Sequence, residues 1–227
     1  EHRDDGFQGF ELSLHGDWKQ EIDLTSSGVW KKDGSDFTLT LNSCEGAFLT
    51  QSFSLDSPFT FEKTQESLTL SEANWSLGEG DLTAEFHLDS DTLQLQAEGK
   101  HVPLGLLGVL YPKMAFQGTA SFQTRLEGPG DAVTGYLFAA LEKADFSQNK
   151  AKGTLQLHLS PSSAQLYTHI YATNQQFLDL TATLPIAFER STLEWKPIDS
   201  RPITGELTMQ GAIEDIFDFV NTASHKA

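Results

Sequence analysis

Several features that hold other folds together are missing from this sequence. Among its 227 residues there is one cysteine, Cys44, so no disulfide can form within the chain and the fold must depend on burial and strand pairing. Only 15 residues are Lys or Arg against 32 Asp and Glu, which gives a formal net charge of −17 at pH 7. This excess argues against binding nucleic acid or lying flat on an anionic membrane surface.

Long apolar runs are also missing. No stretch reaches the roughly 18 to 20 apolar residues that a membrane-spanning helix needs. Residues 1–5 are polar and charged, unlike the start of a secretion signal. We therefore expect that this segment neither crosses a membrane nor directs its own export, and that it belongs to a longer protein whose anchor lies elsewhere.

Catalytic signatures are absent as well. The sequence has no GxSxG, HExxH or paired CxxC, and no phosphate-binding GxxxxGK followed by Ser or Thr. Close acidic pairs such as Glu79/Asp81 and Glu214/Asp215 are expected by chance in a chain with 32 acidic residues. We predict that the chain is not an enzyme and carries no cofactor.

The sequence is instead rich in period-two alternation of apolar and polar residues. Residues 10–15 and 37–42 alternate strictly, and the pattern returns along the chain, as from Leu180 to Phe188, with Gly, Pro, Asp or Ser clusters between, to give about a dozen predicted strands. Such alternation is typical of half-buried antiparallel strands. It predicts an all-β fold, an elongated curved antiparallel sheet (a β-taco or groove), with one or two short helices at residues 103–110 and 212–220.

Two short helices cannot cover about a dozen strands. The apolar side must therefore meet another sheet, as in a sandwich or barrel, or form a groove that a ligand fills. No linker or change in composition divides residues 1–227, so we predict one continuous segment. A strand, a glycine and a short apolar helix at residues 93–110 recur at 205–220, which suggests repeat-like units at about 93–204 and from 205 to 227.

Some polar and aromatic residues offer weaker alternatives. His87, Asp89 and Asp91 share one face of a predicted strand, where they would either hold a metal or form the solvated side opposite the apolar residues; we favour the solvated side and predict no metal site. Residues 78–80 and 128–130 are glycine-bearing turns rather than phosphate loops. The four tryptophans are either a sugar-stacking platform or, as we favour, packing residues: Trp18, Trp30, Trp75 and Trp195.

Residues 93–146 resemble the repeat of the TamB family of translocation and assembly proteins, which are AsmA-like, bridge-like lipid-transfer proteins. An amphipathic strand leads to a short apolar helix ending near Pro112, then to a strand with Gly118 near its start, then to Leu126, Gly128 and Gly135 around a turn. Residues 178–220 resemble the start of the next unit. Asp131 lies where the family commonly has a proline.

The resemblance implies a periplasmic protein anchored in the inner membrane through a segment outside this sequence. It implies an outer-membrane partner of the Omp85 type (TamA-like), phospholipid acyl chains carried along the inner face of the sheet, and support for outer-membrane biogenesis and protein translocation and assembly. With the alternation, it predicts that the following residues line a lipid groove: Leu39, Leu41, Phe53, Leu55, Phe86, Leu88, Leu93, Leu95, Phe116, Phe122, Leu126, Leu155, Leu157, Leu159, Leu180, Leu184 and Phe188.

Two other classes stay open. A structural or adhesive β-solenoid, such as an autotransporter passenger, would bury the same apolar residues in a closed dry core. It would also favour short regular repeats and Asn or Ser ladders, which this sequence lacks. A β-rich carbohydrate enzyme would use the carboxylates and tryptophans, and is the least favoured reading.

Overall fold

The computed structural model describes residues 6–17, 21–48, 51–109, 117–129, 132–146, 149–172, 175–189, 192 and 194–210. In these ranges the chain forms sixteen strands and one 3₁₀ helix, with no α-helix. Every strand pair with a defined register is antiparallel, which confirms the predicted all-β antiparallel fold. The second predicted helix, residues 212–220, lies outside the described residues.

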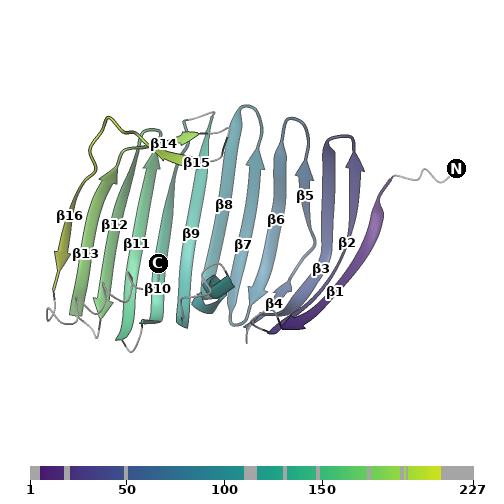
Figure 1. The fold of residues 1–227 in the computed structure, drawn as a ribbon, viewed down its shortest axis with the longest axis horizontal. Coiled ribbons are helices and arrows are strands. Elements are labelled where there is room, and N and C mark those ends of the chain that lie inside the picture. Colours follow the sequence, from purple (N-terminus) through teal and green to yellow (C-terminus); the bar gives the residue numbers. More distant parts are fainter. Residues whose placement is uncertain are drawn as a thin grey trace. The chain divides into compact units, whose positions relative to one another are not determined.

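Figure 1 labels the strands and colours the chain in sequence order. The elements are β1 (Gln8–Asp17), β2 (Glu21–Asp33), β3 (Asp36–Phe48), β4 (Gln51–Leu55), β5 (Phe59–Lys63), β6 (Leu68–Leu77), β7 (Gly80–Leu88), β8 (Thr92–Pro103), η1 (Leu104–Val109), β9 (Gln117–Pro129), β10 (Thr134–Phe146), β11 (Asn149–Ser160), β12 (Ser163–Ala172), β13 (Gln175–Leu184), β14 (Ile186–Glu189), β15 (Glu194–Pro197) and β16 (Thr204–Met209).

Fourteen of these strands belong to one sheet, in the order β1-β2-β3-β4-β6-β7-β8-β9-β10-β11-β12-β13-β16, with β5 paired to β3 and β6. Neighbours in the sheet are therefore neighbours in sequence almost throughout. This order follows from short hairpin connections, which keep successive antiparallel strands side by side. Strands β14 and β15 form a separate two-stranded sheet.

The chain divides into two compact units. Unit 1 comprises Glu1–Val102 with Arg125–Gly130, and unit 2 comprises Pro103–Thr124 with Asp131–Ala227. Strand β9 contributes to both, since its residues from Arg125 onward belong to unit 1. That residues 1–227 act as one continuous segment stays a prediction.

Two hairpins of unit 1 depend on glycine. Gly34 and Gly78 are the first of the two residues that join β2 to β3 and β6 to β7, and their φ values are +62° and +66°. A positive φ at this position is typical of type II′ turns, whose twist matches that of the flanking strands. The predicted turn at residues 78–80 is thus formed by Gly78 and Glu79, whereas Gly128 lies within β9 and Gly130 is outside the described residues.

Strands β4 and β5 together fill one place in the sheet. Both pair with β3 on one side and with β6 on the other, and residues 56–58 interrupt them. Pro58 has no N–H to donate to a ladder, which explains an interruption at this point. Asp56 bridges it, because its N–H donates to the Asn74 carbonyl at 2.8 Å and its carboxylate accepts from Ser76 Oγ at 2.8 Å.

A second proline divides a stretch that the sequence predicts as a single strand. The predicted run from Leu180 to Phe188 breaks at Pro185: β13 ends at Leu184 and β14 begins at Ile186 in the separate hairpin. The Pro185 carbonyl accepts a hydrogen bond from the Ile198 N–H at 2.8 Å. Pro185 thus directs the chain out of the large sheet.

Candidate functional site

One face of unit 1 is apolar across all of its strands. Directly paired residues in adjacent strands project to the same face, so the register assigns each side chain to one side. A single row runs from Trp30 through Leu39, Phe61, Leu70 and Phe86 to Leu95. The apolar face of unit 1 comprises Phe10, Leu12, Leu14, Leu24, Trp30, Phe37, Leu39, Leu41, Cys44, Phe53, Leu55, Phe59, Phe61, Leu68, Leu70, Ala73, Trp75, Leu77, Leu82, Ala84, Phe86, Leu88, Leu93, Leu95 and Ala97.

Aromatic rings cluster on this face. The ring centroid of Trp75 is 6.5 Å from that of Phe53 and 6.2 Å from that of Phe59. The ring centroid of Phe37 is 6.4 Å from those of Trp30 and Phe61. Tilted pairs at these separations are favourable contacts between aromatic rings. The face is therefore a continuous apolar surface within unit 1.

Most of these side chains are only half-buried. In the described part of the chain, eight apolar residues are at most 9% exposed, and in unit 1 these are Cys44, Ala73, Leu77 and Leu93. Leu12 and Leu14 are 49% and 48% exposed. Side chains covered by a second packed layer would be almost fully buried. The described residues therefore provide no second layer over this face.

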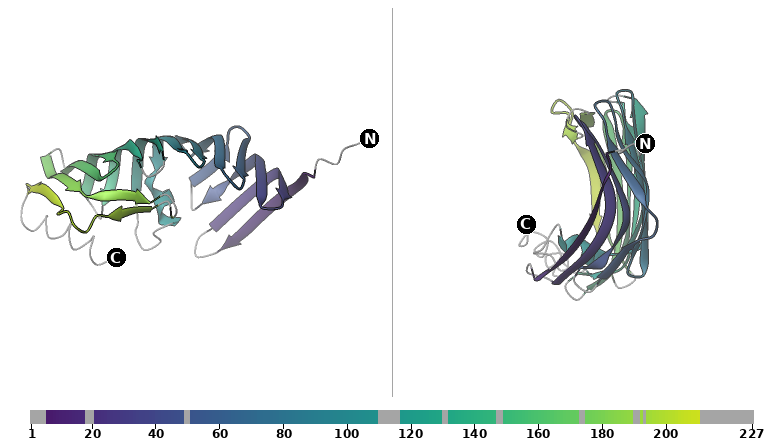
Figure 2. Two further views of the ribbon diagram at one scale, coloured as in Figure 1. Left: turned by 90° about the horizontal axis from the view of Figure 1, so that it is seen from above. Right: turned by 90° about the vertical axis from the view of Figure 1, so that its right-hand side faces the viewer.

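The opposite face of unit 1 is polar and largely acidic. Its side chains pair across strands: Ser27 with Ser43 at 2.7 Å, Thr40 with Thr60 at 3.0 Å, and the His15 imidazole with the Asp23 carboxylate at 2.9 Å. Glu11, Glu45, Glu62, Glu85 and Glu98 lie on the same side. The sheet is thus strongly two-sided, with most of its charges on the polar face; Lys32 and Lys63, which lie opposite Phe37, are on the apolar face. Figure 2 (right) shows that strands β1–β3 are bowed along their length.

Unit 2 has an apolar face of the same kind. The register places Leu155 opposite Ala139, Leu157 opposite Leu166, and Leu180 opposite Leu207. The apolar face of unit 2 comprises Leu137, Ala139, Leu141, Leu155, Leu157, Leu159, Ala164, Leu166, Ile170, Leu178, Leu180, Ala182, Leu184, Leu207 and Met209. The other face of these strands mixes polar residues with exposed rings, among them Phe138 and Tyr171 at 39% and 42% exposure.

The register assigns most of the predicted groove residues to these two faces. On the unit 1 face lie Leu39, Leu41, Phe53, Leu55, Phe86, Leu88, Leu93 and Leu95. On the unit 2 face lie Leu155, Leu157, Leu159, Leu180 and Leu184. Phe122 and Leu126 are half-buried in β9, where they alternate with the exposed residues Gln123, Arg125 and Glu127. That any of them contacts lipid stays a prediction.

Two predicted groove residues lie elsewhere. Phe116 is outside the described residues. Phe188 lies off the large sheet, in β14, where it is 7% exposed and its ring centroid is 5.2 Å from that of Trp195. Trp195 comes from β15 and directly faces Phe188. In the structure Phe188 therefore packs within its own hairpin.

The prediction omitted several residues that belong to the unit 1 face, including Trp30, Phe61 and Trp75. Phe61 alternates with Phe59 in β5, so alternation alone could have found it. Trp30 has Gly28 and Lys32 two residues away on either side, so alternation gives little signal for it. Trp75 is also hard to find, because the apolar residues of β6 lie at even positions up to Leu70 and at odd positions from Ala73 onward. Two residues of β6 lie there opposite one residue of β7, which is the arrangement of a β-bulge.

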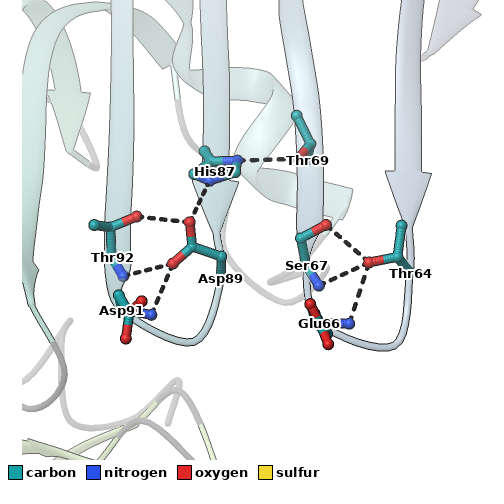
Figure 3. A network of polar contacts seen from close by, with 8 residues as sticks. All are labelled: Thr64, Glu66, Ser67, Thr69, His87, Asp89, Asp91 and Thr92. Atoms are coloured by element: carbon teal, nitrogen blue, oxygen red, sulfur yellow. Dashed lines mark hydrogen bonds and ion pairs between the residues drawn. The ribbon is translucent and has the colours of Figure 1, made fainter.

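The His87, Asp89 and Asp91 group forms part of a turn (Figure 3). Asp89 Oδ1 accepts from the N–H groups of Asp91 and Thr92 at 2.8 and 2.7 Å, and Oδ2 lies 2.9 Å from His87 Nε2. His87 Nδ1 lies 3.1 Å from Thr69 Oγ1 on the neighbouring strand. These bonds, the one from His87 first, hold the pKa of Asp89 well below its ordinary value.

The neighbouring hairpin between β5 and β6 is closed in the same way. Thr64 Oγ1 accepts from the N–H groups of Glu66 and Ser67 at 3.1 and 2.9 Å. Figure 3 shows the two turns side by side. Side-chain oxygens that accept from the backbone two and three residues ahead stabilise turns. Asp89 therefore acts as a turn residue, and among the described residues no group of three or more His, Cys, Asp or Glu is placed to hold a metal ion.

The described ranges contain no helix with the length and hydropathy of a membrane span. Scans against protein-family models, curated proteins and solved structures found no match to the chain. The fold and its two-sided sheet therefore carry the functional argument, and the resemblance to the TamB family stays a prediction.

Proposed function

We propose that the chain is a segment of a protein bridge between the inner and outer membranes, and that it conducts phospholipid along its apolar faces. The observation that carries this proposal is the unit 1 apolar face, which is continuous from β1 to β8 and has no second layer among the described residues. A surface of this kind is costly in water unless something apolar covers it.

The dimensions of the face suit an acyl chain. On β7 the apolar residues extend from Leu82 to Leu88, which at about 3.3 Å per residue is a width of about 20 Å. An acyl chain occupies half of the ~30 Å hydrocarbon core of a bilayer, or about 15 Å. Each CH₂ that the face keeps out of water is worth roughly 0.8 kcal/mol. The face would thus lower the barrier to moving a lipid through water without any chemical reaction.

The alternative of a closed β-solenoid fits less well. Solenoids stack repeats into coils around a continuous buried core. Here successive strands pair antiparallel with their sequence neighbours. The eight apolar residues that are at most 9% exposed are scattered over five strands, the 3₁₀ helix and one loop rather than gathered in one core. These features favour an open apolar surface.

The wider setting is part of the same proposal and rests on the resemblance of residues 93–146 to the TamB repeat. In this proposal the protein lies in the periplasm and is anchored to the inner membrane through a segment outside this sequence. It acts with an Omp85-type outer-membrane protein (TamA-like). Its role is to supply phospholipid for outer-membrane biogenesis and to support protein translocation and assembly. The acidic outer face keeps such a segment soluble.

Site-specific photocrosslinking tests the proposal. A photoreactive amino acid is introduced at Phe86, on the apolar face, and in a second variant at Glu85, the adjacent residue on the polar face. Both variants are expressed in cells in the full-length protein, irradiated and analysed by mass spectrometry for attached phospholipid. We expect capture at Phe86 and none at Glu85.

Capture at neither position, in a protein that is folded by circular dichroism, would overturn the proposal. It would indicate that the apolar face is covered in the full-length protein by another part of the structure. Equal capture at both positions would indicate non-specific adsorption and would also count against a lipid path on one face.

A further inference from the structure

Two lysines lie at one border of the unit 1 apolar face. Phe37 in β3 pairs with Lys32 of β2 on one side and with Lys63 of β5 on the other, so all three side chains project to the apolar face. Their row continues through Leu68 to Leu88. Beyond this row come the turns that join β2 to β3, β5 to β6 and β7 to β8. The lysines therefore lie at the turn end of these strands, where the apolar face stops.

The opposite border of the face carries no charge among the described paired residues. There the row runs from Ile22 through Phe48 to Gln51, and further along the sheet Leu77 faces Gly80. No Asp or Glu with a described strand partner in unit 1 projects to the apolar face. The two lysines are thus the only charged side chains that the described register places on this face, and both are at the same border.

Neither lysine has an acidic partner within the described residues. Both side chains are exposed, and no ion pair in the described ranges involves them. The acidic residues next to them in sequence, Asp33 and Glu62, project to the polar face. On that face Lys100 pairs with Glu98 at 3.1 Å. Two ammonium groups left without a partner, in a chain with 32 acidic and 15 basic residues, are complementary to a negative group supplied from outside.

The two lysines are close enough to act on one negative group. One strand separates them, so their Cα atoms are about 10 Å apart, which is twice the spacing of neighbouring strands. A lysine ammonium is carried on a long flexible stem, which can lie along an apolar surface while the charge stays in water. Both ammonium groups can therefore reach a phosphate placed over Phe37, with the apolar face extending away from it.

We propose that Lys32 and Lys63 bind the headgroup of an anionic phospholipid whose acyl chain lies on the unit 1 apolar face. From Leu88 to Leu82 the face is about 20 Å wide, more than the ~15 Å length of an acyl chain. The net charge of −17 by itself disfavours an anionic lipid, so a preference for one has to come from these two side chains. This inference rests on the proposed lipid path and adds to it the charge of the headgroup and the direction in which the lipid lies.

Competition between two phospholipids measures the charge preference. Full-length protein with a photoreactive residue at Phe86 is incubated at low salt with vesicles of equal parts phosphatidylglycerol, which is anionic, and phosphatidylethanolamine, which is zwitterionic. Mass spectrometry then quantifies the lipids captured on irradiation. We expect at least about a threefold excess of phosphatidylglycerol, because each exposed ion pair contributes modestly and two act together. The excess should disappear in the double variant Lys32→Gln, Lys63→Gln, and also at high salt, which screens exposed charges.

The double variant Lys31→Gln, Lys100→Gln is the matched control. It removes the same charge from side chains that project to the polar face, and it should leave the excess unchanged. Equal capture of the two lipids by the wild type, or the same loss of preference in the control, would overturn this inference while the capture itself still supported the lipid path. Capture of neither lipid at Phe86 would overturn the lipid path and this inference with it.

A second measurement tests the direction of the lipid. Photoreactive residues are introduced at Leu88, in the row of the two lysines, and at Leu82, near the opposite border on the same strand. Fragmentation of the captured phosphatidylglycerol shows which part of the lipid carries the crosslink. We expect attachment near the headgroup from Leu88 and to the acyl chain from Leu82. The reverse pattern, or the same pattern from both positions, would refute a headgroup held by Lys32 and Lys63.

Discussion

Phe10 and Gly28 face each other across β1 and β2, and the Phe10 ring packs where a side chain at residue 28 would lie. A Cβ on Gly28 would be 2.8 Å from Cε1 of Phe10 and 2.4 Å from the Thr40 carbonyl oxygen. Phe53 and Gly46 have the same relationship across β4 and β3, at 2.9 Å. Aromatic rings that cover glycines restore packing where a strand has no side chain.

Gly28→Ala should therefore destabilise the fold. The new methyl group cannot move away from the Thr40 carbonyl, because both belong to paired backbones, and we expect a loss of about 1–3 kcal/mol in the free energy of unfolding. Gly9→Ala is the control, since nothing lies within 4 Å of a Cβ at residue 9, and it should be neutral or slightly stabilising. Urea unfolding followed by circular dichroism measures both. Equal midpoints for the two variants would contradict the close contact at Gly28.

A charge on the apolar face should reduce lipid binding. Leu95→Glu places a carboxylate in the row that contains Phe86 and Leu70, where it would have to lose water to meet an acyl chain. Phospholipid recovered with the purified full-length protein should fall at least about tenfold. Gln96→Glu makes the same charge change on the adjacent polar face and should leave lipid recovery unchanged. Similar losses in both variants would point to net charge as the cause.

The turn at Asp89 should make stability depend on pH at the acidic end. Its pKa is lowered in the folded state, so the charged carboxylate stabilises the fold above its unfolded pKa of about 3.9, and this contribution is lost as the pH falls below that value. Asp89→Asn keeps an oxygen that accepts from the backbone but removes the charge.

The unfolding midpoints of the wild type and of Asp89→Asn should therefore differ at pH 7 and converge as the pH falls toward 3. Asp89→Ala, which also removes the acceptor for the Asp91 and Thr92 N–H groups, should be the less stable variant at both pH values. A constant difference between the wild type and Asp89→Asn over this range would show that the charge contributes nothing.

Cys44 should be a slow-reacting thiol that reports on unfolding. It is 9% exposed, and burial raises the pKa of its thiol, so little reactive thiolate is present. Alkylation at pH 8 should be at least about tenfold slower in the folded chain than in urea. The double variant Ser43→Cys, Cys44→Ser moves the thiol to an exposed position on the polar face and should react rapidly when folded. Rapid alkylation of native Cys44 would show that the sheet opens locally there.

A substitution at Phe188 distinguishes packing within the β14–β15 hairpin from contact with lipid. Because its ring is 7% exposed and packs on Trp195, Phe188→Ala should destabilise the β14–β15 hairpin, by up to about 3–5 kcal/mol, without changing lipid capture at Phe86. Hydrogen exchange of the hairpin amides measures the first effect, and photocrosslinking the second. Lower capture with an unchanged hairpin would instead support Phe188 as a residue of the lipid path.

The sequence alone determined that the chain folds into antiparallel strands and which nearby side chains of a strand share a face. Side-chain alternation depends on the local backbone, so Leu39 and Leu41, or Phe86 and Leu88, can be assigned to one side without knowledge of a partner strand. The polar and acidic character of the other face follows from the same pattern. These assignments gave the fold class, and most of the groove residues predicted from them lie on the two apolar faces.

Only the tertiary structure decided where, along a strand, the apolar side chains switch between odd-numbered and even-numbered positions. In β3 the apolar face passes from Leu41 to Cys44, and in β6 from Leu70 to Ala73, because two residues of one strand lie there opposite one residue of its neighbour. A β-bulge is a property of a pair of strands, so no single-strand pattern contains it. The departure of Phe188 from the sheet and the bonds that Asp89 makes within its turn likewise depend on which groups the folded chain brings into contact.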